Sequence, residues 1–365
     1  MEATVYSRRL NIFIFFLLPL LFCFFSFKNQ SVSKLFEVIF LLSIILFLLY
    51  YTHQYNLKKT NMLLISGFVI FSILLYYLFF ILGSTFDNKY FLTNFYYLTI
   101  FLYAYVLSLV KINYGKSTIS LFVVILNLFN LVYFVSQYFG VHSPLDALYT
   151  TYDLTRGTRM LEIRPNGFLG NSNYSALFTL YSFIAVNSKQ HKIFLFAILS
   201  IIIFIAEPMA TMGLLLLYIL IKLRIKLYIL IPTIVLFIAY ALATINIEDM
   251  YSLYHRFSVL QKLFEFMDGN ILMILFGGVN LNFFLESSGL TYLDSIIPLI
   301  FLSNGAIGFL IFIIFYFVAF KNYTTQRARF IYITYFMQLF VLPSITNVLL
   351  FFPVVLFVFL ADQKR

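Results

Sequence analysis

Residues 117–139 read STISLFVVILNLFNLVYFVSQYF, and none of these 23 residues carries a charge. A helix needs about 20 consecutive apolar residues to cross roughly 30 Å of hydrocarbon. A helix also satisfies its backbone hydrogen bonds within itself, which is the condition for crossing lipid. This stretch therefore predicts a transmembrane helix.

The rest of the chain has the same character as this stretch. Of the 365 residues, 62% are hydrophobic and 10% are charged, which leaves too little polar surface to cover a water-soluble globule of this length. We predict an all-α, polytopic integral membrane protein that forms a single membrane domain, 1–365. About 12 transmembrane helices are expected, at 10–27, 33–51, 62–82, 91–110, 117–139, 174–187, 193–206, 208–221, 227–244, 294–319, 330–342 and 345–361.

The basic residues predict the orientation of these spans. Cytoplasmic loops are enriched in Lys and Arg. If Arg8 and Arg9 are cytoplasmic, Lys364 and Arg365 fall on the same side, as do most of the other lysines and arginines. Both termini are therefore expected in the cytoplasm. The net charge of +10 sits in short loops between apolar runs, so we expect no nucleic-acid partner.

Two long connections, 140–173 and 245–293, are predicted on the outer face under this topology. Long loops are often functional. The second loop contains Asn270–Phe276, an apolar piece too short to span and followed by Gly277 and Gly278. This pattern indicates a re-entrant or interfacial segment, with a thirteenth span as the alternative.

Three arginines, Arg156, Arg159 and Arg164, lie within nine residues of the first outer loop, on the side that is normally poor in arginine. A guanidinium group can bind two phosphate oxygens at once and stays charged at physiological pH, so this cluster suits a pyrophosphate group. A solvated loop that touches anionic lipid is the alternative. Gly and Asn residues just before the next helix supply turns and exposed amides that favour anions, namely Asn166, Gly167, Asn171 and Asn173.

The remaining candidate residues are isolated. His255 and Arg256 lie in the second loop, and His255 is a candidate for proton transfer, although a lone loop histidine is commonly an ordinary surface residue. Glu207 and Asp294 are acids predicted inside or at the ends of spans, where functional roles and simple helix capping are both open. The separated histidines and carboxylates lack metal-ligand spacing, so no metal is expected.

Three local patterns resemble the O-antigen polymerase and O-antigen ligase (Wzy and WaaL) superfamily of bacterial membrane glycosyltransferases. The first is Arg164-Pro-Asn-Gly167 followed by Asn173 at the opening of a span. The second is a pair of short helices broken at Glu207-Pro-Met-Ala-Thr-Met-Gly213, where the family's usual arginine is missing. The third is Asp294-Ser before a helix with Gly305-Ala-Ile-Gly308, where ligases usually carry histidine. The missing histidine favours polymerase over ligase.

The resemblance implies an enzyme of the bacterial cytoplasmic membrane whose active site faces the periplasm or cell exterior. It would act as a polysaccharide repeat-unit polymerase for O-antigen, capsule or exopolysaccharide. A glycan would leave its polyprenyl diphosphate and join another lipid-linked repeat unit, without metal or cofactor. The implied partners are this lipid-linked oligosaccharide, membrane lipid, and a flippase and chain-length regulator of the same pathway.

The chemistry of such a transfer assigns roles to the candidate residues. The leaving group is a lipid pyrophosphate, so its developing charge must be neutralised. We expect Arg164, Arg159 and Arg256 to hold the pyrophosphate, with Arg156 in support. The attacking hydroxyl needs a base, for which Asp294 and His255 are the candidates. Asn166, Gly167, Asn171, Asn173 and Glu207 are expected to line the substrate site.

Three other functions remain open at this point. A ligase would differ only in its acceptor. A flippase or another carrier of lipid-linked oligosaccharide also has about a dozen spans, but it would need a charged central cavity, and few acids are predicted within the spans. The third alternative is a non-catalytic member of the assembly complex.

Overall fold

The computed structural model describes residues 11–24, 39, 42–43, 45–47, 50, 88–109, 116–141, 165, 167–168, 172–206, 208–223, 232, 251–279, 281–290, 296–339 and 347–362. These residues form helices joined by turns and irregular segments, and none of them lies in a β-strand. The all-α prediction is therefore confirmed for the described part of the chain.

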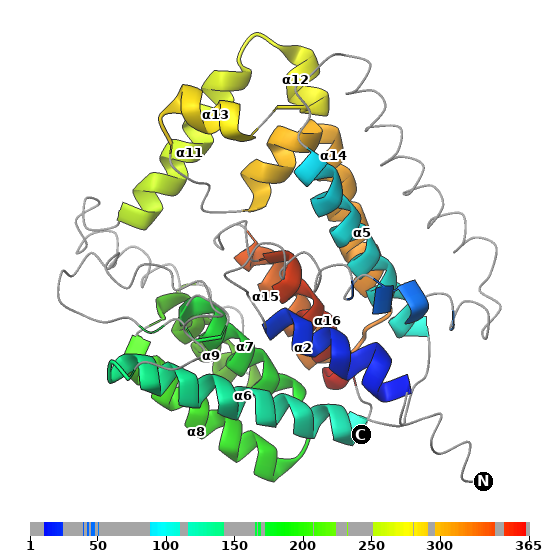
Figure 1. The fold of residues 1–365 in the computed structure, drawn as a ribbon, viewed down its shortest axis with the longest axis vertical. Helices are drawn as coiled ribbons and strands as arrows, with labels where there is room; N and C mark the ends of the chain where they lie inside the picture. Colours follow the sequence, from blue (N-terminus) through cyan, green and yellow to red (C-terminus); the bar gives the residue numbers. More distant parts are fainter. Residues whose placement is uncertain are drawn as a thin grey trace.

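Apart from α11 and α13, the described helices coincide closely with the predicted apolar stretches. Figure 1 shows how the helices are arranged. Most ends fall within a few residues of the predicted spans, since the charged and polar residues that bound each apolar run also end the helix. The elements are η1 (Phe13–Leu17), α2 (Leu18–Phe24), α5 (Asn88–Leu109), α6 (Lys116–Tyr138), α7 (Ser172–Ala185), α8 (Lys189–Ala206), α9 (Met209–Lys222), α11 (Tyr251–Met267), α12 (Ile271–Phe276), α13 (Leu281–Ser288), α14 (Ile296–Phe320), α15 (Gln326–Gln338) and α16 (Asn347–Ala361).

Three helices of the described residues are long and apolar enough to cross a membrane: Lys116–Tyr138, Lys189–Ala206 and Pro298–Phe320. Shorter apolar helices cover Thr99–Leu109, Ala210–Lys222 and Phe351–Ala361. By length and composition, the described part of the chain is thus helical with segments suited to spanning a membrane. The total of twelve spans, the orientation and the two outer loops stay predictions, and the spans at 62–82 and 227–244 fall almost wholly outside the described residues.

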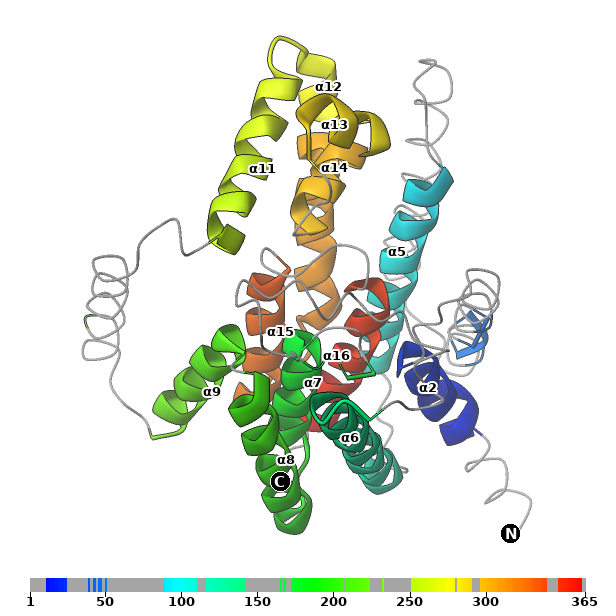
Figure 2. The same ribbon diagram turned by 60° about the vertical axis from the view of Figure 1, so that its left-hand side comes forward.

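Helices α6, α7, α8 and α9 lie together at one side of the structure (Figure 2). Polar side chains join α6 to α7 inside this group. The Nδ2 of Asn127 donates to Ser182 Oγ at 3.0 Å and to the carbonyl of Val123 at 2.8 Å. Such interhelical hydrogen bonds hold helices together where lipid removes the hydrophobic driving force.

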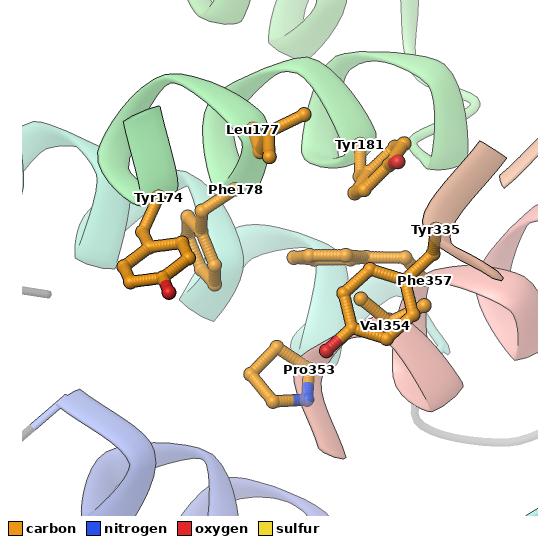
Figure 3. A pocket seen from close by; sticks show the side chains of 8 residues that line it. All are labelled: Tyr174, Leu177, Phe178, Tyr181, Tyr335, Pro353, Val354 and Phe357. Carbon is orange, nitrogen blue, oxygen red and sulfur yellow. The ribbon is translucent and has the colours of Figure 1, made fainter. Parts of the chain in front are cut away.

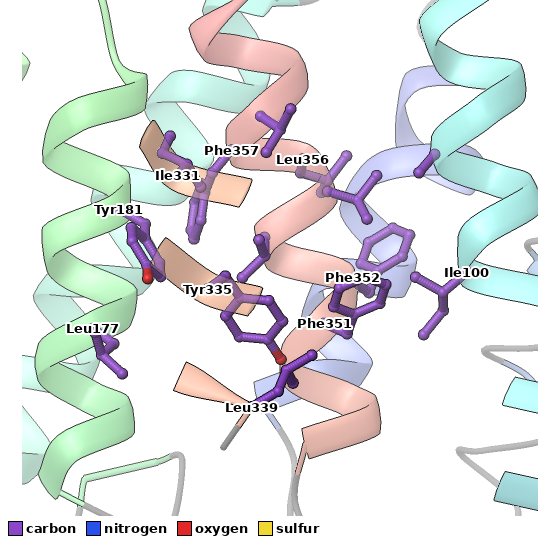
Figure 4. Packing of buried hydrophobic residues seen from close by; sticks show 14 of the residues in the cluster. Ile100, Leu177, Tyr181, Ile331, Tyr335, Leu339, Phe351, Phe352, Leu356 and Phe357 are labelled. Atoms are coloured by element: carbon purple, nitrogen blue, oxygen red, sulfur yellow. The ribbon is translucent and has the colours of Figure 1, made fainter. Parts of the chain in front are cut away.

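Aromatic side chains from α5, α14, α15 and α16 pack against one another in the core. Figure 4 shows part of this core, where residues of α7, α15 and α16 meet. The rings of Tyr335 and Phe351 stack with centroids 5.3 Å apart. Phe101 packs edge-on against Phe351 at 5.4 Å and against Phe312 at 5.3 Å. The high Phe and Tyr content of the sequence therefore has a structural use, because these rings pack helix against helix.

Basic residues gather at one end of this bundle. The Nη1 of Arg327, at the start of α15, lies 3.5 Å from the carbonyl of Ile184 near the end of α7. The same end holds Asp362, whose carboxylate accepts the backbone N–H groups of Thr324 and Thr325 at 2.9 Å. Burial, and secondarily the Asp362 carboxylate, raises the pKa of Tyr323 above its ordinary value. Lys116, Lys189, Lys192, Lys222, Lys321 and Arg329 also lie at helix ends on this side.

Candidate functional site

The N-terminal end of α7, opposite the basic end, follows a short turn at Gly167 and Phe168 that is hydrogen-bonded to α6. The backbone N–H of Phe168 donates to Asn130 Oδ1 at 2.9 Å, and the N–H of Gly167 donates to Gln137 Oε1 at 2.9 Å. Ser175 Oγ, in the first turn of α7, lies 3.4 Å from the same Asn130 oxygen. One amide side chain of α6 therefore joins the turn to the first turn of α7.

Gly167 is required at this turn for two reasons. First, the backbone φ of Gly167 is +66°, which residues with a side chain rarely adopt. Second, Gly167 is buried and has no room for a side chain. A Cβ at this position would lie 2.6 Å from Asn130 Oδ1 and would also collide with Ser175 Oγ. The glycine thus permits the close approach of the turn to the two helices.

Aromatic stacking fixes the same turn from its other side. The ring of Phe168 stacks on that of Tyr133 with centroids 4.7 Å apart and planes only 5° from parallel. Pro165 is buried as well. Arg164 is bonded directly to Pro165, so the point at which the arginine-rich loop joins the helices is set by this anchored turn.

Asn130 retains an unused donor. Its side chain is fully buried, and its Nδ2 has no hydrogen-bond partner among the described residues. A buried amide N–H without a partner costs about 1–3 kcal/mol. Such a cost is commonly tolerated at functional sites, where a ligand or an ordered water completes the bond.

The amides of α6 were not among the residues predicted from sequence. Asn127, Asn130 and Gln137 are spaced by three and seven residues, which places them on one face of a helix. Polar residues that share one face of an otherwise apolar span indicate an interface with a polar partner. That signal was present in the sequence and would have identified them.

An aromatic pocket lies beside the first turns of α7 (Figure 3). Its volume is about 20 Å³, room for roughly one water molecule. The rings of Tyr174, Phe178 and Tyr181 on α7 face Tyr335 of α15 and Phe357 of α16 across it. With this volume the pocket is a packing feature, and it does not accommodate a lipid chain.

Two of the predicted site residues are among those that the structure describes. Gly167 lies in the anchored turn, and Asn173, which is half-buried, lies in the first turn of α7. The other candidates are outside the described residues: Arg156, Arg159, Arg164, Asn166, Asn171, Glu207 and Asp294. His255 and Arg256 belong to α11, but their side chains are likewise outside the description.

The second predicted loop contains helices where only one apolar piece was expected. α11 covers 17 residues, and α12 and α13 follow it. α12 coincides with the apolar piece Asn270–Phe276, and Asn270 begins it by accepting the N–H of Met273 at 3.1 Å. Whether this helix is re-entrant in a membrane stays a prediction.

The segment after α12 caps a break inside α14. Gly305 has φ +64° and ψ −168°, which interrupts the helix between its two halves. The N–H groups of Gly278 and Val279 donate to the carbonyls of Ser303 and Leu302 at 3.2 and 3.1 Å. Irregular backbone at membrane depth must be satisfied inside the protein. The second loop therefore supplies N–H donors to carbonyl groups of α14 that lack helical partners because of the break.

No group of three or more His, Cys, Asp or Glu residues within the described ranges could hold a metal ion. A metal-independent reaction stays a prediction. Comparison of the chain with models of protein families, with curated proteins and with solved structures found no match.

Proposed function

We propose that this protein transfers a glycan from a polyprenyl diphosphate to another lipid-linked repeat unit, as a polysaccharide polymerase of the cytoplasmic membrane. The observation that carries the proposal is the anchored turn at Gly167 and Phe168. This turn ends the arginine-rich loop, and two of its backbone N–H groups donate hydrogen bonds of 2.9 Å to side chains of one apolar helix.

The arrangement is suited to holding a charged headgroup next to lipid. A pyrophosphate leaving group requires cations that are fixed before the reaction, because preorganised charge stabilises a transition state without further reorganisation. Arg164 is bonded directly to the buried Pro165, and Gly167, two residues after Pro165, is hydrogen-bonded to α6. The start of α7 adds backbone N–H groups, which favour anions. A lipid tail would remain in the bilayer beside the exposed apolar faces of α6.

Mass spectrometry of lipid-linked glycans tests the proposal in cells that lack this protein. We expect a single repeat unit on polyprenyl diphosphate to accumulate. Wild-type protein should restore the polymer, whereas Arg164→Ala should restore less than about 1% of it, since loss of one charge-stabilising group commonly lowers turnover by 10²–10³.

Arg329→Ala is the matched control. Arg329 is an exposed arginine in α15 at the other end of the bundle, so its removal changes the net charge equally and leaves the anchored turn intact. Full polymer with both variants, at equal abundance in membranes, would refute the proposed role of Arg164. Full polymer with Arg159→Ala and Arg256→Ala as well would favour a non-catalytic member of the complex.

The same measurement separates the alternatives. Long polymer that builds up on the carrier would identify a ligase, because elongation would then be intact. An unchanged glycan profile would exclude both transferases, and trapping of the repeat unit on the inner leaflet would indicate a carrier. The break in α14 does not favour a carrier, since its carbonyls at Leu302 and Ser303 already accept hydrogen bonds from the second loop.

A further inference from the structure

A second polar feature lies at the basic end of the bundle, away from the anchored turn. α7 has 14 residues, so its two ends are separated by about 21 Å at 1.5 Å per residue. Near its C-terminal end a cavity of about 170 Å³ opens between α8, α9 and α15. One water needs about 10–15 Å³ measured in this way, so the cavity has room for a polyatomic ion with several waters.

Three cations from three different helices line this cavity: Lys192 of α8, Lys222 of α9 and Arg327 of α15. None of its described lining residues is acidic. The partial positive charges of two helix N-termini add to these cations, because α8 begins at Lys189 and α15 at Gln326, and neither helix has an acid in its first turn. Positive charges that line the same cavity favour the binding of an anion there.

Two of the side chains that line the cavity are buried and pack against each other. Tyr218 and Phe330 are 8% and 7% exposed, and their rings meet edge-on with centroids 5.3 Å apart. Arg327 is tied to α7 through the carbonyl of Ile184 at 3.5 Å. A planar guanidinium fixed by its own helix and by a neighbour is suited to binding two oxygens of a phosphate group.

Apolar side chains flank the cations on the outside of the bundle. Ile193, next to Lys192, is 62% exposed, and Leu223, next to Lys222, is 67% exposed. Side chains of this kind contact lipid tails in a membrane protein. Basic pockets between helices on the cytoplasmic side of a membrane bind the headgroups of anionic lipids.

We propose that this cavity, which we name the Lys192–Lys222–Arg327 pocket, binds a phosphate group, with an anionic phospholipid headgroup as the favoured source and free phosphate as the other. The pocket is independent of the proposed glycan transfer. It would fix the ends of α8, α9 and α15 against the membrane surface, at the opposite end of α7 from the anchored turn.

Native mass spectrometry of the purified full-length protein tests this inference by titration with phosphatidylglycerol. We expect wild type to retain one lipid that the double variant Lys192→Gln/Lys222→Gln binds at least about tenfold more weakly, since charge-assisted hydrogen bonds to phosphate are lost. Phosphatidylcholine, which is neutral overall, should bind both proteins equally. The single variant Lys222→Gln removes an exposed side chain and so keeps the test valid if the double variant is unstable.

The double variant Lys189→Gln/Arg329→Gln is the matched control. It also removes two positive charges, one from α8 and one from α15. Both side chains are exposed and neither lines the pocket. This control should retain the lipid as wild type does. Equal loss of phosphatidylglycerol in both double variants would show a diffuse surface charge effect and would overturn the proposal, as would equal retention in both.

A second arm distinguishes the two sources of phosphate. If inorganic phosphate at constant ionic strength displaces phosphatidylglycerol and raises the melting temperature of wild type but not of Lys192→Gln/Lys222→Gln, the pocket takes free phosphate. If phosphate does neither while the lipid binds as expected, the pocket takes the lipid headgroup. Either result supports a phosphate site, whereas absence of both lipid and phosphate binding in wild type overturns it.

Discussion

The Oδ1 of Asn130 accepts the backbone N–H of Phe168 at 2.9 Å, a bond that joins the middle of α6 to a turn 38 residues later in the chain. Because the turn carries the last residues of the arginine-rich loop, Asn130 and Gln137 together connect α6 to the proposed reactive part of the protein.

Asn130→Ala should lower the free energy of unfolding by about 1–3 kcal/mol, because the buried N–H of Phe168 would lose its acceptor. It should also reduce polymer formation by at least about tenfold, since the turn next to Arg164 would be released. Thermal unfolding in detergent and polymer analysis in cells measure the two effects.

Asn127→Ala is the comparison for Asn130→Ala. It removes an equally buried amide of α6 that bonds to Ser182 and does not contact the turn. We expect similar destabilisation but near-normal polymer. An equal loss of polymer in both variants would mean that α6 acts through general stability.

Gly167→Ala should destabilise the protein more than Gly140→Ala. Both glycines have φ +66°, so both substitutions carry a backbone cost of roughly 1–2 kcal/mol. A Cβ at Gly140 meets nothing within 4 Å, whereas a Cβ at Gly167 meets Asn130 and Ser175. The difference in melting temperature between the two variants therefore measures the cost of the contacts of the added methyl group with Asn130 and Ser175. Equal melting temperatures would contradict the tight packing of the turn at Gly167 against α6 and α7.

Gly277→Ala should be strongly destabilising, by about 2–4 kcal/mol, because a Cβ there would lie 2.5 Å from the backbone nitrogen of Gly305 in the break of α14. Gly289→Ala has a comparable positive φ of +62° and open space around it. Proteolysis of the second loop in membranes should accelerate in Gly277→Ala only. Equal proteolysis rates would contradict the packing of this loop on α14.

The predicted orientation can be tested with single cysteines in a Cys23→Ser background. Asp268 lies between α11 and α12, and Lys189 starts α8 at the basic end. A membrane-impermeant maleimide should label Asp268→Cys in intact cells, and Lys189→Cys only after permeabilisation. The reverse pattern would place the basic end outside and contradict the positive-inside assignment.

The structure inside the second loop could be predicted only in part from the sequence. The apolar piece before Gly277 and Gly278 was visible in the sequence, but α11 was not predicted. Nothing local to Gly305 revealed that its helix breaks, because the capping groups come from Gly278 and Val279, about 25 residues earlier. Contacts of this kind depend on which surfaces meet, and a single sequence does not encode that in any short window.

The sequence by itself determined that the chain is helical and built for a membrane, because long uncharged stretches must satisfy their backbone hydrogen bonds internally. It also determined approximately where the described helices begin and end, apart from α11 and α13 in the second predicted loop. Only the tertiary structure decided that Asn130 and Gln137 hold the turn at Gly167, and that Lys192, Lys222 and Arg327 share one cavity. Helix formation depends on neighbours three and four residues apart, whereas these sites depend on side chains that are distant in sequence and meet only after the helices pack.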